Sequence, residues 1–410
     1  AHWGVAWIYL GVILGLAVYW KNGDRIRNVA LQHNAFTFFH LLKSYFGRRT
    51  ARYFAMLAFS GYLVLTVLQL AIGAKLLTLT GVFSLPIATL ILIGFSIVYL
   101  IAGGLKASVI SDTIQLTLIT AFIAVSFWFA VKSAPVNPET VISMFSTDGL
   151  SINIATTFLF LSVLMFTPDA LLRIFATDKS NSVRHAVNFS ITLFMVFGAL
   201  LGAIGIWINA NYPTIAAEDA PLMLITQIIP AGFQAFAILG LLATIMSSID
   251  TNLFTAAQTL ANDIVQSSLF ESKRSARRAI RWALIILLPI CSIMALTIDN
   301  VVEIYFYLVF FLACGCHPLI AIMCNKRSAF AVVSSSAFAV TSCVVLLVVG
   351  KLTEINAAAI IATSIVYWWL SASWLERKLP ITTTKSSEDV YGRNVSDVNR
   401  DDFEGAKLAS

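Results

Sequence analysis

Long apolar runs dominate this sequence, and their length decides which solvent the chain can fold in. A helix needs about 20 residues to cross the hydrocarbon core of a bilayer. Runs of that order lie at 3–20, 53–79, 84–102, 109–131, 151–167, 186–209, 231–258, 280–297, 301–323, 329–350 and 357–375. The chain is 59% hydrophobic and 12% charged, whereas about a quarter of the residues in a soluble domain are charged. We therefore predict an all-α polytopic membrane protein with about eleven transmembrane helices.

The loops between these runs alternate in charge, which predicts their orientation. Lys and Arg gather in every second loop, as in "KRSARR" at 273–278, and the intervening loops are neutral or acidic, as in "AAEDA" at 216–220. Positively charged loops tend to stay in the cytoplasm. The alternation therefore predicts a multi-pass protein of the cell membrane (plasma or inner membrane) with a cytoplasmic C-terminus. Nucleic acid is not an expected partner, because the basic residues are divided among short loops and form no single surface.

The rest of the chain fits around a transmembrane domain expected at 1–375. Residues 34–47, "NAFTFFHLLKSYFG", have apolar positions at helical spacing, and they predict a short amphipathic helix on the cytoplasmic face. Residues 376–410 are polar and mixed in charge, so a cytoplasmic tail without fixed structure is expected there. The chain begins almost inside an apolar run and without Met. We therefore expect it to be a piece of a longer protein.

The stretch "ATIMSSIDTNLFTAAQTLAND", residues 243–263, is too polar for a helix surrounded by lipid. On a helix, seven of its polar side chains fall within an arc of about 100°, and we call this face the polar stripe. Its members are Thr244, Ser247, Ser248, Thr251, Thr255, Gln258 and Asn262. Such a face must lie against protein or a water-filled path. Hydroxyl oxygens suit a small hard cation, but hydroxyls that join helices or bond to their own backbone are the common alternative.

Acidic residues accompany this stripe and a second motif. Asp250 flanks the stripe, and Asp263 ends it, where we expect it to cap the helix or to pair with the "KRSARR" cluster. The second motif is "GGLKASVISDTIQ" at 103–115, whose two glycines are expected to end one helix before Asp112 begins the next. A carboxylate in a spanning helix costs a few kcal/mol in hydrocarbon. Asp112 is therefore expected to line a vestibule, bind a cation or pair locally.

The motifs together resemble the sodium/solute symporter family. "GGLKASVISDTIQ", then "TPDALLRIFATDKS" at 167–180, then residues 219–264 follow the order and spacing typical of the family, and the resemblance extends over 1–375. It implies a transporter fold of two inverted five-helix repeats, each with a broken first helix. The first four runs would be core helices two to five, and the next five would be core helices six to ten. Core helix one would then be missing from this chain.

The resemblance also implies a sodium site. In the family, two adjacent hydroxyl residues and a carbonyl from core helix eight bind the ion, and these positions correspond to Ser247, Ser248 and the Thr244 carbonyl. The aspartate of the glycine-glycine motif, which corresponds to Asp112, is associated with sodium release or with a second ion position. Asp250 stands where some members have a hydroxyl residue of a second sodium site, so it is a secondary candidate.

The function expected from these residues is sodium-coupled symport of a small organic solute by alternating access, with Thr251 and Thr255 as further candidate ligands. The solute itself is not identified by the sequence. A symporter-like sensor domain of a signalling protein, a channel-like protein and a proton-coupled transporter are the alternatives. The last is considered because Asp112 and Asp250 can both titrate.

Other motifs are interpreted as structural. "CGCH" at 314–317 lacks the spacing of a haem attachment site, and it is interpreted as small residues packed at a helix interface. Asp169 and Arg173 are expected to order a cytoplasmic loop and not to touch the solute. The sequence shows no nucleophile–base pair, phosphate loop or cluster of metal ligands, so we do not expect an enzyme.

Overall fold

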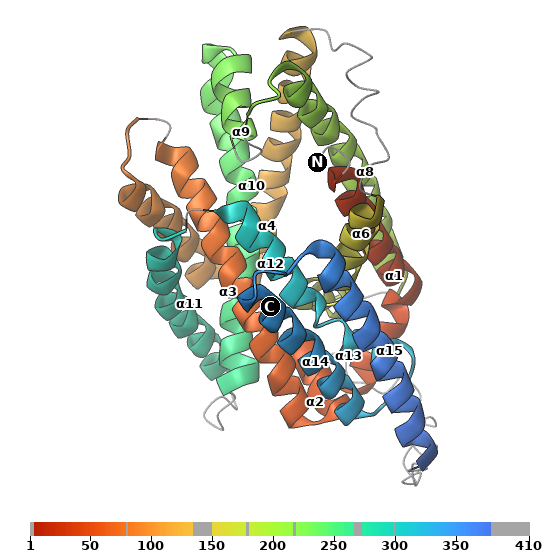
Figure 1. Cartoon of the computed structure of the whole chain (residues 1–410). Helices are drawn as coiled ribbons and strands as arrows, with labels where there is room; N and C mark the ends of the chain where they lie inside the picture. Colours follow the sequence, from red (N-terminus) through yellow and green to blue (C-terminus); the bar gives the residue numbers. More distant parts are fainter. Residues whose placement is uncertain are drawn as a thin grey trace.

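The computed structural model describes residues 4–78, 81–133, 150–177, 180–215, 219–265, 273–298 and 300–378, and all regular elements in these ranges are helical (Figure 1). In chain order they are α1 (Gly4–Gln32), α2 (Phe38–Phe46), α3 (Arg48–Thr78), α4 (Leu85–Ser133), α6 (Leu150–Leu164), α7 (Pro168–Phe175), α8 (Ser180–Asn211), α9 (Ala220–Met223), the π-helix η1 (Leu224–Ile228), α10 (Ala231–Gln258), the π-helix η2 (Thr259–Val265), α11 (Lys273–Ala295), α12 (Val301–Ala313), α13 (His317–Met323), α14 (Ala329–Val348) and α15 (Glu354–Lys378). The predicted all-α class is confirmed. The predicted tail, from residue 379 onward, lies outside the described residues.

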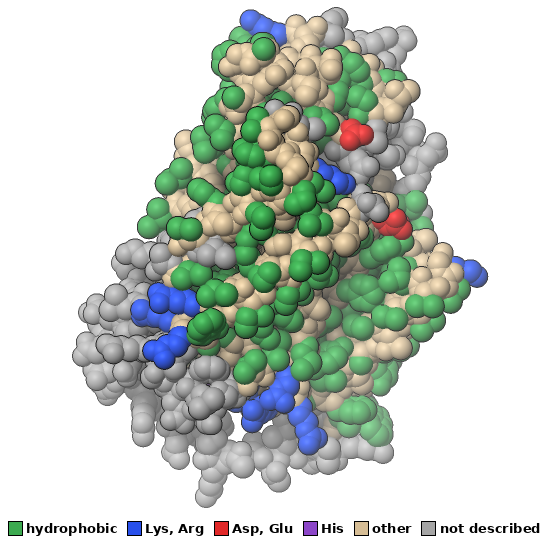
Figure 2. Space-filling model, turned by 90° about the vertical axis from the view of Figure 1, so that its left-hand side faces the viewer, with side chains coloured by type: hydrophobic (Ala, Val, Ile, Leu, Met, Phe, Trp, Pro, Cys, Tyr) green, Lys and Arg blue, Asp and Glu red, His purple; other side chains and the backbone are tan. Residues whose placement is uncertain are grey.

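Eight helices in the described ranges are long and apolar enough to cross a membrane, or nine if α6 and α7 are counted as one bent span. Figure 2 shows apolar side chains over most of one face, with Lys and Arg mainly toward its lower end. Soluble monomers rarely expose contiguous apolar patches above a few hundred Å². An outer surface of this kind is suited to lipid.

One predicted helix boundary is wrong. The runs at 84–102 and 109–131 belong to a single helix, α4, which continues through Gly103 and Gly104. Glycine costs about 1 kcal/mol relative to alanine inside a helix. This cost is small enough for the helix to continue through both residues, so the glycines alone do not end it.

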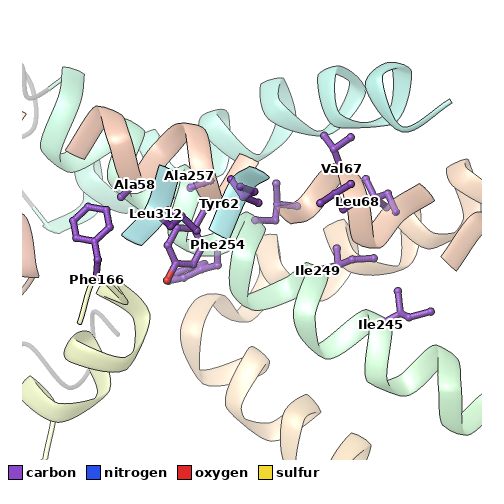
Figure 3. Close-up of a cluster of buried hydrophobic side chains, with 14 of the residues drawn as sticks. Ala58, Tyr62, Val67, Leu68, Phe166, Ile245, Ile249, Phe254, Ala257 and Leu312 are labelled. Carbon is purple, nitrogen blue, oxygen red and sulfur yellow. The ribbon is translucent and has the colours of Figure 1, made fainter. Parts of the chain in front are cut away.

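Helix α10 is packed between α3 and α4 and extends through most of the height of the molecule (Figure 1). Gly73 of α3 provides space at this junction, because a Cβ atom there would lie 2.8 Å from Leu92 of α4 and 3.1 Å from Ile245 of α10. Figure 3 shows the apolar side of the contact, which includes Leu68 of α3 and Ile249 of α10. The apolar face of α10 is therefore fixed, and its polar stripe has a defined direction.

Helices α6 and α7 form a broken helix, with a bend of 46° between them. Pro168 begins α7; it suits the first turn of a helix because that position has no backbone acceptor for an N–H group. The break lies in the run that the family resemblance assigns to core helix six, for which a break is expected.

Helix α2 lies within the predicted amphipathic segment 34–47. Thr37 caps its start by accepting a hydrogen bond from the His40 backbone N–H at 3.0 Å, and Gly47 ends it. Helix α2 packs on α3 and α7. Its buried residues are Phe38, Phe39, Leu41, Leu42 and Phe46. The apolar face of this helix is therefore covered by protein.

Candidate functional site

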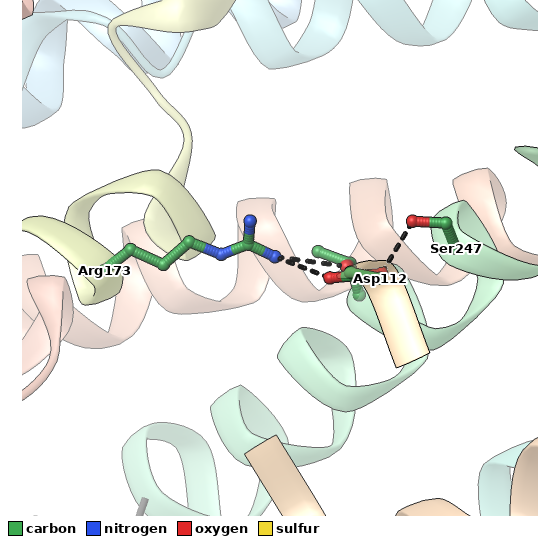
Figure 4. Close-up of polar contacts among 4 residues, drawn as sticks. Asp112, Arg173 and Ser247 are labelled. Atoms are coloured by element: carbon green, nitrogen blue, oxygen red, sulfur yellow. Dashed lines mark hydrogen bonds and ion pairs between the residues drawn. The ribbon is translucent and has the colours of Figure 1, made fainter. Parts of the chain in front are cut away.

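The two motifs of the predicted ion site meet where α10 crosses α4 (Figure 4). The Ser247 hydroxyl donates a hydrogen bond to Asp112 Oδ1 at 2.6 Å, across 135 positions of sequence. The Asp112 side chain is 22% exposed, so its carboxylate keeps partial access to solvent. This contact brings together a residue from each motif singled out in the sequence.

Arg173 of α7 extends the group to a third helix (Figure 4). Its Nη2 atom lies 3.4 Å from Asp112 Oδ2 and 3.5 Å from the Thr251 hydroxyl of α10. We expected Arg173 to order a loop, but the segment after the break continues as helix α7 and directs the guanidinium at Asp112. Because the Arg173 side chain is 51% exposed, the ion pair adds little to stability. Its main consequence is to connect α7, α4 and α10.

The remaining predicted sodium ligands lie on the same face of α10. The Ser248 hydroxyl donates to the Thr244 carbonyl at 3.3 Å, which places two candidate ligand oxygens side by side. Thr244 is exposed, and Ser247 and Ser248 are partly exposed. A carbonyl oxygen has two lone pairs, so the Thr244 carbonyl can accept its helical hydrogen bond and still face an ion.

The secondary candidates are separated by the structure. Thr251 joins the Arg173 contact, whereas Thr255 is buried lower on α10. Asp250 is fully buried and lies next to Ser96 of α4, so it is not part of the Asp112–Ser247 group. In the described ranges, no three His, Cys, Asp or Glu side chains are placed to hold a metal ion together. Ion ligands at this site would have to be mainly hydroxyl and carbonyl oxygens.

Contacts that the sequence did not reveal hold the α6–α7 break in place. The Tyr62 hydroxyl of α3 donates to Asp169 Oδ1 at the start of α7. The Tyr19 hydroxyl of α1 donates to the Leu164 carbonyl at 2.5 Å and lies 3.0 Å from the Thr167 hydroxyl. These residues position α7, and through it Arg173. Tyrosines inside apolar runs carry no pattern that predicts such distant partners.

A cavity of about 200 Å³ lies at the end of the stripe, between α2, the start of α3 and η2. Its lining residues are Phe36, Thr37, Phe39, His40, Lys43, Arg48, Ala51, Asn262 and Asp263. The Asp263 carboxylate, which we expected to cap the helix or to pair with the cluster at 273–278, accepts a hydrogen bond from the Thr37 hydroxyl at 3.1 Å. Burial and the nearby Lys43 lower the pKa of His40, so this imidazole is neutral at pH 7.

A bundle of membrane-spanning helices, with a broken helix beside a stripe of oxygen ligands, defines a membrane transporter and not an enzyme. The profile of the sodium:solute symporter family matches residues 1–325. The chain therefore belongs to the sodium:solute symporter family, whose activity is sodium-coupled symport. The match ends before α14 and α15, so it is shorter than the range 1–375 over which we described the resemblance.

A comparison with solved structures supports the fold. The chain is similar to a structure described as the substrate-bound outward-open state of a Na⁺-coupled sialic acid symporter with a novel Na⁺ site. The TM-score is 0.65 at 14% identity, over 91% of this chain and 89% of the other. At that identity the similarity establishes the shared fold. No curated protein matches the sequence.

Proposed function

We propose that this symporter imports a small organic solute across the cell membrane by alternating access, with its C-terminus in the cytoplasm. We further propose that its sodium ion binds at Ser247, Ser248 and the Thr244 carbonyl. The hydrogen bond from Ser247 to Asp112 carries this proposal, because it places a carboxylate next to the family's hydroxyl pair. An ion between neutral oxygens and an adjacent negative charge is held by ligands of the kind that hard cations prefer.

Asp112 has a separate role in this proposal. Its carboxylate is shared between Ser247 and Arg173, so an ion that leaves the hydroxyl pair has a negative group within reach. Arg173 competes for that carboxylate, and this competition keeps sodium from being held there tightly. Asp112 thus assists transfer of sodium toward the cytoplasm.

The first experiment compares the thermal stability of the purified protein in sodium and in potassium, for the wild type and for Ser247→Ala/Ser248→Ala. A ligand at 100 times its Kd stabilises the folded state by about 2.7 kcal/mol. We expect a sodium-specific increase in Tm that the double variant loses. Ser190→Ala is the matched control, because the Ser190 hydroxyl bonds only to its own helix in α8. A wild type without any difference between the two cations would contradict the proposed site.

Proton coupling is the second candidate, and the complete burial of Asp250 within the spanning helix α10 is the observation that favours it. Buried carboxyl groups in membrane transporters are typical of proton relays. Uptake driven by a pH gradient without sodium, and abolished by Asp250→Asn, would support this candidate against sodium coupling.

A further inference from the structure

The polar stripe continues below the predicted sodium site toward the cavity at the end of α10. A small cavity of about 10 Å³ is lined by Asp169, Thr255 and Gln258 among others, and the cavity of about 200 Å³ follows it. Both cavities are lined by Thr37, Phe39 and Asp263. The smaller one has room for about one water molecule. The space along the lower stripe therefore narrows where Thr37 and Asp263 meet.

The Thr37 hydroxyl makes two contacts at this point. Its oxygen accepts the His40 backbone N–H at 3.0 Å, which caps α2, and its proton is donated to Asp263 Oδ1 at 3.1 Å. A hydroxyl has one proton and two lone pairs, so both contacts form together. The start of α2 is in this way attached to η2, the π-helix that directly follows α10.

The charges around Asp263 suit passage of a cation better than its retention. Lys43 and Arg48 line the same cavity as Asp263. A cation that reaches Asp263 has to compete with these fixed positive charges. It is therefore held weakly and leaves readily into the cavity.

We propose that the Thr37–Asp263 hydrogen bond is the inner gate on the route of sodium, and that Asp263 is the last protein ligand the ion meets. This inference rests on the proposed function. Breaking the bond separates α2 from η2 and opens the narrow point between the two cavities. Helix α2 also packs on α7, the helix of Arg173, so movement of α2 reaches the Asp112 group through a direct contact.

Three substitutions of Thr37 distinguish its role in the gate from its role as the N-cap of α2. Thr37→Ser keeps both the acceptor and the donor. Thr37→Asp keeps the acceptor that caps α2, but an ionised carboxylate has no proton to donate to Asp263. Thr37→Ala removes both contacts. Purified variants are reconstituted into liposomes, where the exchange rate of radioactive sodium is measured, and sodium-dependent Tm is measured on the same preparations.

We expect Thr37→Ser to exchange sodium at the wild-type rate. Thr37→Asp and Thr37→Ala should both exchange it about tenfold faster, which corresponds to about 1.4 kcal/mol, with an unchanged sodium effect on Tm. A wild-type rate in Thr37→Asp, with only Thr37→Ala altered, would show a cap alone and overturn the gate. If sodium does not change the Tm of the wild type, the proposed sodium site is rejected instead.

A fourth variant tests the role of Asp263. The amide oxygen of Asp263→Asn still accepts the Thr37 hydrogen bond, but the negative charge is gone. We expect slower sodium exchange at an unchanged sodium effect on Tm. An exchange rate equal to that of the wild type would show that the carboxylate is not on the route of the ion.

Discussion

Two helix breaks in this molecule are held together in different ways. The α6–α7 break, at residues 165–167, is surrounded by hydroxyl groups from other helices, and the helix after it begins with an acidic residue bonded to Tyr62. The α12–α13 break, at residues 314–316, is lined by fully buried small residues. The Cys314 carbonyl accepts a hydrogen bond from Ser336 at 2.7 Å and faces His317 Nδ1 at 3.1 Å.

The two breaks touch each other. A Cβ atom at Gly315 would lie 2.3 Å from the ring of Phe166, which is 1% exposed and sits inside the α6–α7 break. Each break leaves backbone groups that must be satisfied within the membrane. At α12–α13 the Cys314 carbonyl is bonded by Ser336 of α14, and at α6–α7 Tyr19 of α1 bonds the Leu164 carbonyl and Tyr62 of α3 bonds Asp169. All three donor side chains are buried. We predict that α12–α13 acts as a packing support for the α6–α7 break.

The largest expected effect comes from Gly315→Ala, which forces a methyl group into Phe166. Overpacking of this kind costs about 1–3 kcal/mol. We expect a loss of stability near the upper end of this range, because Gly315 and Phe166 are both buried, and thermal unfolding measures the loss. Gly315→Ala/Phe166→Leu should recover most of the loss. Gly202→Ala in α8, where a new Cβ meets nothing within 4 Å, is the control, and an equal loss there would contradict this account.

Tyr62→Phe is expected to have the second-largest effect on stability. It removes the hydroxyl that donates to Asp169 and leaves a carboxylate without that donor, which costs about 1–3 kcal/mol. Tyr307→Phe removes a similar bond to Glu303 on an exposed surface, and we expect less than about 1 kcal/mol there. The comparison of the two Tm values tests whether α7 depends on its distant partner.

Ser336→Ala should cost about 1 kcal/mol, the usual value of a neutral hydrogen bond. It removes one donor to the Cys314 carbonyl and the 3.3 Å contact with the Tyr53 hydroxyl, but leaves His317 in place. Ser334→Ala, on the same helix, removes a bond to the Ala331 carbonyl of its own helix and should cost less. If α12–α13 is only a support, solute uptake by Ser336→Ala remains at the wild-type level, and a changed dependence on sodium would refute that view.

The smallest effect on stability is expected for Arg173→Gln, below about 1 kcal/mol, because the ion pair with Asp112 is partly exposed. The rate of sodium exchange should nevertheless change in this variant, because the guanidinium that competes with sodium for the Asp112 carboxylate is then absent. Measuring Tm and exchange on the same sample distinguishes the two effects. A stability loss as large as that of Tyr62→Phe would mean that Arg173 has a structural role.

The sequence predicts the elements of this protein better than it predicts the contacts between them. The apolar runs lie in helices, and the amphipathic segment predicted at 34–47 contains α2. Both the apolar runs and the helical spacing are local patterns, so the sequence alone reveals them. The bond between Ser247 and Asp112 spans 135 positions, and the bond between Tyr62 and Asp169 spans 107. The resemblance assigned Ser247 and Asp112 to sodium binding, but no local pattern connects Tyr62 to Asp169. Continuation of α4 through Gly103 also escaped prediction, because glycine is tolerated inside a helix at a cost of about 1 kcal/mol and does not by itself end one.

A single residue, Gly47, separates α2 from α3, and its φ of 92° with ψ of 165° lies in a region open almost only to glycine. A Cβ atom there would meet nothing within 4 Å, so the glycine is needed for its backbone angles and not for space. Gly47 therefore sets the angle between α2 and α3. Thr37 lies at the other end of α2, about 14 Å away, so the backbone angles of this one glycine determine where Thr37 meets Asp263 of η2.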